Sequence, residues 1–107
     1  MKSMLFTLPL VLVLSFLFLS VTTVTASDDV GQKFYTKSCG ACHNSGVLDA
    51  PKLGDKAAWA ELIKEGKDEL TESAIKGVGK MPPKGGNAQL TDDEVEEAVE
   101  YMIEKSK

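Results

Sequence analysis

Residues 37–46, KSCGACHNSG, hold the side chains best suited to chemistry in this chain of 107 residues. They include both cysteines, Cys39 and Cys42, and the single histidine, His43. On a helix, residues three and four positions apart share one face, so the three side chains are expected to project together. C-x-x-C-H is the attachment signature of c-type haem. The spacing therefore favours one covalent haem c, with both cysteines as thioethers to the porphyrin vinyl groups and His43 as an iron ligand.

Four other interpretations use some of the same residues. A redox dithiol also has the C-x-x-C spacing, but it normally follows a strand, and no strand pattern precedes Cys39. A structural zinc site usually takes four ligands and a blue-copper site takes two histidines, more than this chain offers. A local disulfide between Cys39 and Cys42 is the fourth interpretation. All four stay open at this point, with haem c the favoured one.

A second iron ligand is predicted in the segment KMPPKGG, residues 80–86. Pro82 disfavours helical geometry at Met81, and the two prolines stiffen the loop that carries its thioether. Met102 falls on the apolar face of a predicted helix, where packing is expected. Ligation by His43 and Met81 would saturate the iron, and a thioether raises the reduction potential. The ligand pair therefore favours electron transfer over catalysis.

The elements that must position these ligands are predicted to be helices. Four are expected, at about 28–42, 55–65 and 68–76 and from Thr91 to near the C-terminus. Ser27 or Asp28 is expected to cap the first and Asp55 the second, while Thr91 and Glu94 form a capping box for the fourth. Loops rich in glycine and proline, NSGVLDAPKLG and GVGKMPPKGGN, separate them. The predicted fold class is all-α, small and loop-rich, with about four helices wrapped around one haem.

The first 26 residues differ from the rest of the chain. Residues 5–21 are uncharged and largely apolar, and a small-residue cleavage site ends at Ala26, which is typical of a secretory signal peptide. We therefore expect residues 1–26 to be a cleaved signal peptide and 27–107 to be a single domain that binds one haem c. An uncleaved membrane anchor is the alternative, because the run approaches the length of a membrane span.

The remaining residues are few for a self-sufficient core, and chains of this size usually need a cofactor, metal or disulfide. A haem would supply the missing apolar body. The candidates for its pocket are apolar residues between the two ligand segments: Leu53, Trp59, Leu62, Ile63, Leu70, Ile75 and Val78. The formal net charge of −4 and the lack of a basic stretch give no indication of nucleic-acid binding.

The segments CGACH, APKLGD and MPPKGG, in this order, resemble the class I cytochromes c, specifically the small monohaem cytochromes c-five of the bacterial periplasm. The resemblance implies that Cys39 and Cys42 bind haem covalently and that His43 and Met81 are its proximal and distal ligands. It also implies that the carbonyl of Pro51 accepts a hydrogen bond from the proximal histidine and orients its ring.

The resemblance extends over residues 28–107. It implies that the first and last helices cross at Gly31, with Tyr35 and Tyr101 packed edge to face. In one respect the chain departs from the family. Many cytochromes c-five carry a second cysteine pair after the methionine loop, which in this chain is residues 80–86 around Met81. Here the segment that follows this loop reads NAQLTDDE and contains no cysteine.

The predicted function is that of a soluble, monomeric electron carrier without enzymatic activity. Its partners would be donor and acceptor redox proteins of a periplasmic respiratory chain: cytochromes, reductases or oxidases. The alternative is a haem c peroxidase or gas-sensing domain with a displaceable distal ligand, for which the loop offers Lys80, Lys84 and Asn87 as polar groups. Lys76, Lys80 and Lys84 bracket Met81 without an acid, so they are expected to steer acidic partners to the haem edge.

Overall fold

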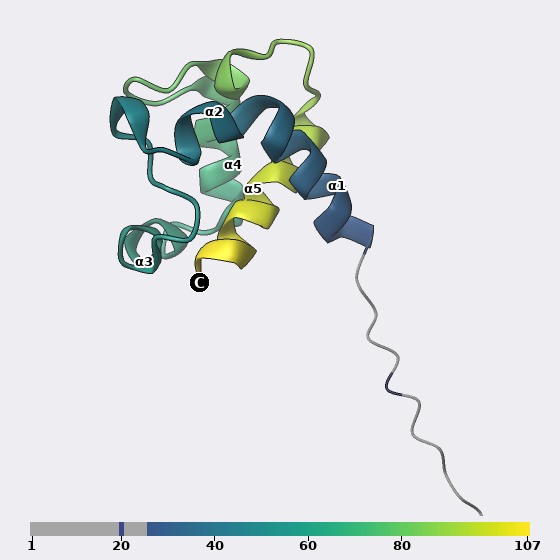
Figure 1. Ribbon diagram of the computed structural model, residues 1–107. Helices are drawn as coiled ribbons and strands as arrows, with labels where there is room; N and C mark the ends of the chain where they lie inside the picture. The colour runs from purple at the N-terminus through teal and green to yellow at the C-terminus, as the bar shows by residue number, and fades with distance from the viewer. Residues whose placement is uncertain (1–19, 21–25) are drawn as a thin grey trace, which may run out of the picture.

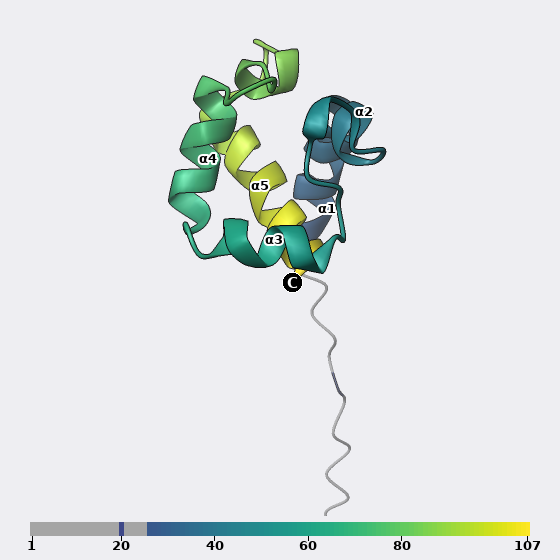
Figure 2. The ribbon, with the colours of Figure 1, turned by 90° about the vertical axis from the view of Figure 1, so that its left-hand side faces the viewer.

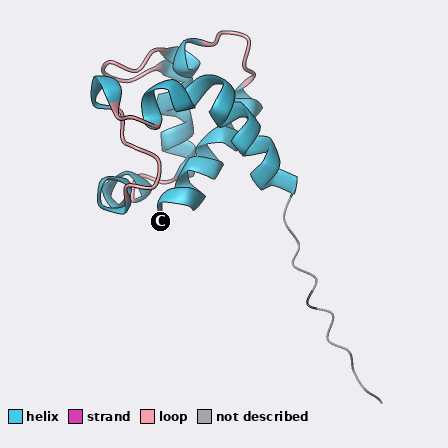
Figure 3. Cartoon of the chain, in the orientation of Figure 1, coloured by secondary structure: helices cyan, strands magenta, loops and turns pink. Residues whose placement is uncertain are grey.

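A computed structural model describes residue 20 and residues 26–107, which are built almost wholly from helices and loops (Figures 1 and 3). The all-α prediction is confirmed. The elements in chain order are α1 (Ala26–Phe34), the π-helical turn η1 (Tyr35–Cys39), α2 (Gly40–His43), the 3₁₀ turn η2 (Val47–Asp49), α3 (Lys56–Ile63), α4 (Lys67–Lys76), the 3₁₀ turn η3 (Pro83–Gly86) and α5 (Asp92–Ser106). One isolated antiparallel bridge joins Val78 and Met81.

The predicted first helix corresponds to α1, η1 and α2, which follow one another without a break in helical structure. Because α1 begins at Ala26, the prediction that Ser27 or Asp28 caps it was wrong, and both lie in its first turn. The sequence also did not indicate η1, where the amide of Gly40 donates to the carbonyl of Tyr35 five residues earlier. π-turns of this kind occur frequently at functional sites. This one comes directly before the C-x-x-C-H turn.

α5 is the central helix of the molecule. It contacts α1, α4 and α3, and Figure 2 shows α4 and α1 on either side of it. Its start matches the predicted cap, because the Thr91 hydroxyl accepts a hydrogen bond from the amide of Glu94 at 3.2 Å. Leu90, just before the cap, is buried in one cluster with Val95 and Val99. The apolar staple thus fixes where the chain enters α5.

The other two helices also start and stop close to the predicted positions. Asp55 caps α3, since its carboxylate accepts a hydrogen bond from the amide of Ala58 at 3.3 Å. Gly66 and Gly77, both at positive φ, flank α4 at its two ends. Glycine adopts this backbone region without the steric penalty of a side chain. The chain therefore turns sharply before α4 and again as it enters the methionine loop.

α1 and α5 cross in close contact at Gly31. A Cβ atom on this residue would lie 2.4 Å from the carbonyl oxygen of Glu97 and 2.8 Å from the Cβ of Tyr101. Beside it, the rings of Tyr35 and Tyr101 pack with centroids 5.4 Å apart and planes tilted by 48°. The predicted crossing residues thus meet as expected, with tilted rings in place of an edge-to-face pair.

The predicted signal peptide and its cleavage site lie largely outside the described residues, as does the membrane-anchor alternative. Among residue 20 and residues 26–107, no helix combines the length and apolar character required to cross a membrane.

Substituting Gly31 tests the close crossing of α1 and α5. Gly31→Val should lower the free energy of unfolding of the haem-loaded protein by about 1–3 kcal/mol, because the new side chain has to displace the backbone of α5. Chemical denaturation followed by circular dichroism measures the change. Gln32→Val, an exposed position of the same helix, controls for helix propensity. An equal loss in both variants would contradict the importance of the crossing.

Candidate functional site

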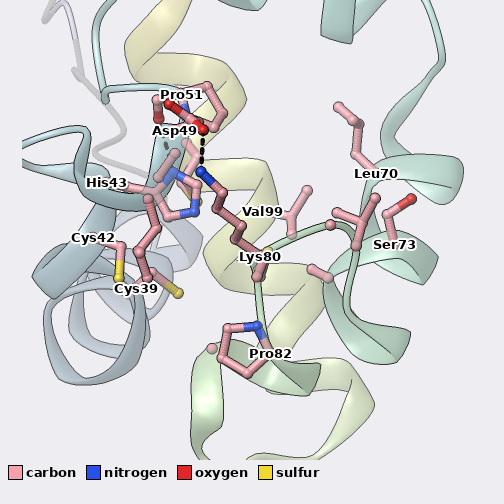
Figure 4. A pocket seen from close by; sticks show the side chains of 18 of the residues that line it. Cys39, Cys42, His43, Asp49, Pro51, Leu70, Ser73, Lys80, Pro82 and Val99 are labelled. Atoms are coloured by element: carbon pink, nitrogen blue, oxygen red, sulfur yellow. Dashed lines mark hydrogen bonds and ion pairs between the residues drawn. The ribbon is translucent and has the colours of Figure 1, made fainter.

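A cavity of about 480 Å³ lies between α2, α3, α4 and α5 and the methionine loop (Figure 4). Its volume falls within the usual range for cofactor sites, and its lining is predominantly apolar. The helices contribute Cys42, His43, Trp59, Leu62, Leu70, Ala74, Val99 and Met102, and the connecting segments contribute Val47, Leu48, Pro51, Val78, Met81 and Pro82. The cavity thus occupies the place where the core of a larger domain would be.

The three residues of the C-x-x-C-H motif line this cavity together. Cys39 and Cys42 are both half-buried free thiols, and Figure 4 shows their sulfur atoms close to the ring of His43. Burial raises the pKa of the Cys39 thiol to about 11. A thiol that stays protonated at neutral pH is a weak nucleophile and a weak metal ligand. This environment is unlike that of a reactive redox dithiol.

The ring of His43 is held in one orientation by the backbone of the following loop. It is 8% exposed, and its Nδ1–H donates a hydrogen bond to the carbonyl oxygen of Pro51 at 2.8 Å. A carbonyl can only accept, so the proton lies on Nδ1 and Nε2 is left free as a ligand atom. Pro51 therefore has the geometry that the resemblance implied.

Met81 reaches the cavity from a tight hairpin. Its amide donates to the carbonyl of Val78 at 2.9 Å, and the amide of Val78 donates to the carbonyl of Met81 at 3.1 Å. Gly77 permits the hairpin, because a Cβ there would lie 2.9 Å from both the carbonyl oxygen of Met81 and the nitrogen of Pro83. Met81 is half-buried and lines the same cavity as His43.

Two side chains secure the far end of the methionine loop, and sequence reasoning missed the contacts of both. The Asn87 amide donates to the hydroxyl of Ser38 at 2.8 Å, which ties the loop to the residue before Cys39. The ammonium of Lys84 donates to the carbonyl of Leu90 at 2.8 Å and pairs with Asp92 at 3.1 Å. The loop is thus attached to both the C-x-x-C-H segment and the start of α5.

The predicted pocket residues divide into two groups. Trp59, Leu62, Leu70 and Val78 line the cavity. Leu53 and Ile63 pack instead on the cluster around Tyr35 and Tyr101, and Ile75 packs on the cluster around Leu90. Sequence periodicity does not separate these groups, because both faces are apolar and the distinction depends on how each helix is rotated.

The donor set fits a haem better than a bare metal ion. In the described part of the chain, no three residues among histidine, cysteine, aspartate and glutamate are grouped so as to hold a metal. An apolar cavity with one imidazole, two thioethers and two thiols at its wall has instead the donors of a covalently attached haem.

Comparison with known proteins identifies the family. Residues 26–102 match the family model described as Cytochrome C oxidase, cbb3-type, subunit III. Cytochrome c-555 of Chlorobaculum tepidum is 51% identical over 81 residues, which cover 72% of this chain and 75% of the relative. Cytochrome c5 of Ectopseudomonas mendocina is 46% identical over 79 residues, covering 72% of this chain and 86% of the relative.

The chain belongs to the c-type cytochromes. Its fold agrees with that assignment, because it superposes with a TM-score of 0.70 and 45% identity on a chain from a crystal structure of an electron transfer complex of nitrite reductase with cytochrome c. The alignment covers 73% of this chain and 95% of that one. The predicted resemblance to small class I monohaem cytochromes is thereby confirmed. In this c-type cytochrome, Cys39 and Cys42 stand at the spacing that binds one covalent haem c.

Removing the attachment cysteines tests whether haem is part of the core of this cytochrome. The Cys39→Ser, Cys42→Ser double variant should be largely unfolded, because the remaining chain buries too little apolar surface without a cofactor. Circular dichroism during heating measures this, with the haem-loaded parent protein as reference. A cooperative thermal transition in the haem-free variant would count against the prediction.

Proposed function

We propose that this cytochrome is an electron carrier whose haem iron is ligated by His43 and Met81. The observation that supports it most strongly is that both side chains line one cavity, although they come from α2 and from the loop after α4. The haem supplies an iron that cycles between the ferric and ferrous states. The residues of the chain orient two ligands toward it and surround it with apolar side chains.

Each ligand has a separate role in this proposal. The Pro51 carbonyl holds the ring of His43 and raises its basicity through the Nδ1 hydrogen bond. The thioether of Met81 favours the ferrous state and raises the reduction potential. With His43 and Met81 both holding the iron, oxygen or a substrate would find no free ligand position, so the protein would transfer electrons without making bonds.

The peroxidase or gas-sensing alternative receives no support from the polar groups near Met81. It would need a polar side chain free to act on a bound molecule. Lys80 pairs with Asp49 at 2.6 Å, Lys84 is bound to the start of α5, and the Asn87 amide donates to Ser38. We therefore propose a carrier over a haem enzyme or sensor.

The surface that would meet redox partners is apolar in character. Three exposed apolar side chains, Val47, Leu48 and Val78, lie at the cavity mouth, with exposures of 47%, 59% and 60%. The lysines predicted to steer partners are each paired with an acid: Lys76 with Glu72, Lys80 with Asp49 and Lys84 with Asp92. This pairing argues against a strong positive electrostatic field at the cavity mouth. We therefore propose that apolar contact contributes more than charge attraction to the binding of redox partners.

We further propose that the cytochrome is exported to the periplasm and serves a respiratory chain there. Attachment of haem through a C-x-x-C-H motif and the apolar run at residues 5–21 support export. Cleavage near Ala26 would leave the haem domain free to move between partners, with a monomer as the proposed state.

Replacing Met81 tests the proposed ligand. In the haem-loaded Met81→Ala variant, the reduction potential should fall and carbon monoxide should bind readily, because an axial position is opened. Visible spectroscopy of the oxidised protein should also lose the band typical of methionine sulfur on ferric haem. Met102→Leu, a buried methionine on α5, is the control and should keep that band. An unchanged spectrum in Met81→Ala would show that Met81 is the wrong residue.

A matched pair of surface variants tests how partners dock. Val78→Ser should slow electron transfer to a physiological partner more than Lys80→Gln does, because it removes apolar contact area whereas the Lys80 charge is already paired. The second-order rate should also depend weakly on salt. Stopped-flow measurements at several ionic strengths provide both results. A larger effect from Lys80→Gln, with a steep salt dependence, would restore the lysine-steering hypothesis.

A further inference from the structure

The segment 51–54 makes a hydrogen bond at each of its four consecutive residues. The Pro51 carbonyl accepts from the His43 ring at 2.8 Å, and the Leu53 amide donates to the His43 carbonyl at 2.8 Å. The Lys52 carbonyl accepts from the indole Nε1–H of Trp59 at 2.9 Å. The Gly54 amide donates to the hydroxyl of Ser106 at 2.9 Å.

The two side-chain partners come from α3, which follows the segment closely, and from α5, far along the chain, and both are deeply buried. Trp59, on α3, is 4% exposed, and Ser106, the last residue of α5, is completely buried at 0%. The complete burial of a serine is not explained by apolar packing. Loss of the Ser106 hydroxyl would leave the Gly54 amide without its partner in the protein, whereas the Lys52 carbonyl would keep a second hydrogen bond, from the amide of Asp55 at 3.1 Å.

We propose that Ser106 and Trp59 are positioning residues for His43, which they orient through segment 51–54. The Ser106 hydroxyl fixes the Gly54 end of the segment and the Trp59 indole fixes its middle. The Pro51 carbonyl is then held in the position where it accepts the hydrogen bond from His43 Nδ1–H. The inference rests on the proposed role of His43 as an axial ligand, and it adds that the end of α5 controls the strength of that ligand.

The expected direction follows from the chemistry of imidazole. A strong hydrogen bond from Nδ1–H makes Nε2 a better donor, which stabilises the ferric state and lowers the reduction potential. A looser segment 51–54 lengthens that bond. The reduction potential should then rise, and the Nδ1 proton of His43 should exchange more readily with water.

Ser106→Ala in the haem-loaded full-length protein is the direct test. It removes one oxygen atom and leaves the surrounding volume almost unchanged. We expect a higher reduction potential by voltammetry, and exchange of the His43 Nδ1 proton that is about tenfold faster by NMR of the reduced protein, in line with the loss of one partly buried hydrogen bond. Thr71→Val is the matched control, because the Thr71 hydroxyl is also buried but has no hydrogen-bond partner in the described part of the chain.

Trp59→Phe provides an independent second variant, since it keeps an aromatic ring and removes the Nε1–H donor. If both residues act through one segment, the two changes should be non-additive in the double variant. A lower melting temperature with an unchanged potential and unchanged Nδ1 exchange in both single variants would overturn the proposal and leave the two residues a purely structural role. Failure of the axial-ligand assignment is seen separately, because the parent protein would then lack a histidine–methionine haem spectrum.

Discussion

The structure depends on a core that the chain does not complete by itself. Eight apolar side chains of the described residues are buried, and they form two clusters beside a cavity of about 480 Å³. Close packing is the normal condition of a protein interior, so a chain of this size cannot leave such a volume at its centre without a bound group. The haem of a c-type cytochrome is therefore part of the core, and each surrounding element is placed with respect to it.

This dependence explains why polar contacts gather around the ligand segments. The loops that carry Pro51 and Met81 lack regular secondary structure, so their backbone groups need other partners. For the loop that carries Pro51, two buried side chains provide them: Trp59 of the following helix and Ser106 at the end of α5. On the distal side, Asn87 and Ser38 join the methionine loop to the attachment segment. The two loops beside the proposed ligands are thus each held at several points.

The electrostatics of the surface follow from the same arrangement. The three lysines of residues 76–84, a segment without an acid, meet acids from η2, α4 and α5 once the chain folds. Exposed pairs of this kind contribute little to stability, but they cancel charge locally. Of the described side chains at the cavity mouth, those that remain without a partner are exposed and apolar: Val47, Leu48 and Val78.

The sequence by itself determined the features that arise from residues close together in the chain. The C-x-x-C-H turn spans five residues, the caps at Asp55 and Thr91 act over three, and the loop around Met81 is shaped by its own prolines and glycines. The tertiary structure decided what depends on residues far apart. Ser106 meets Gly54 across 52 positions, Asn87 meets Ser38 across 49 and Lys80 meets Asp49 across 31. A local pattern carries no information on such pairs, because the rotation and crossing of the helices decide which side chains face each other.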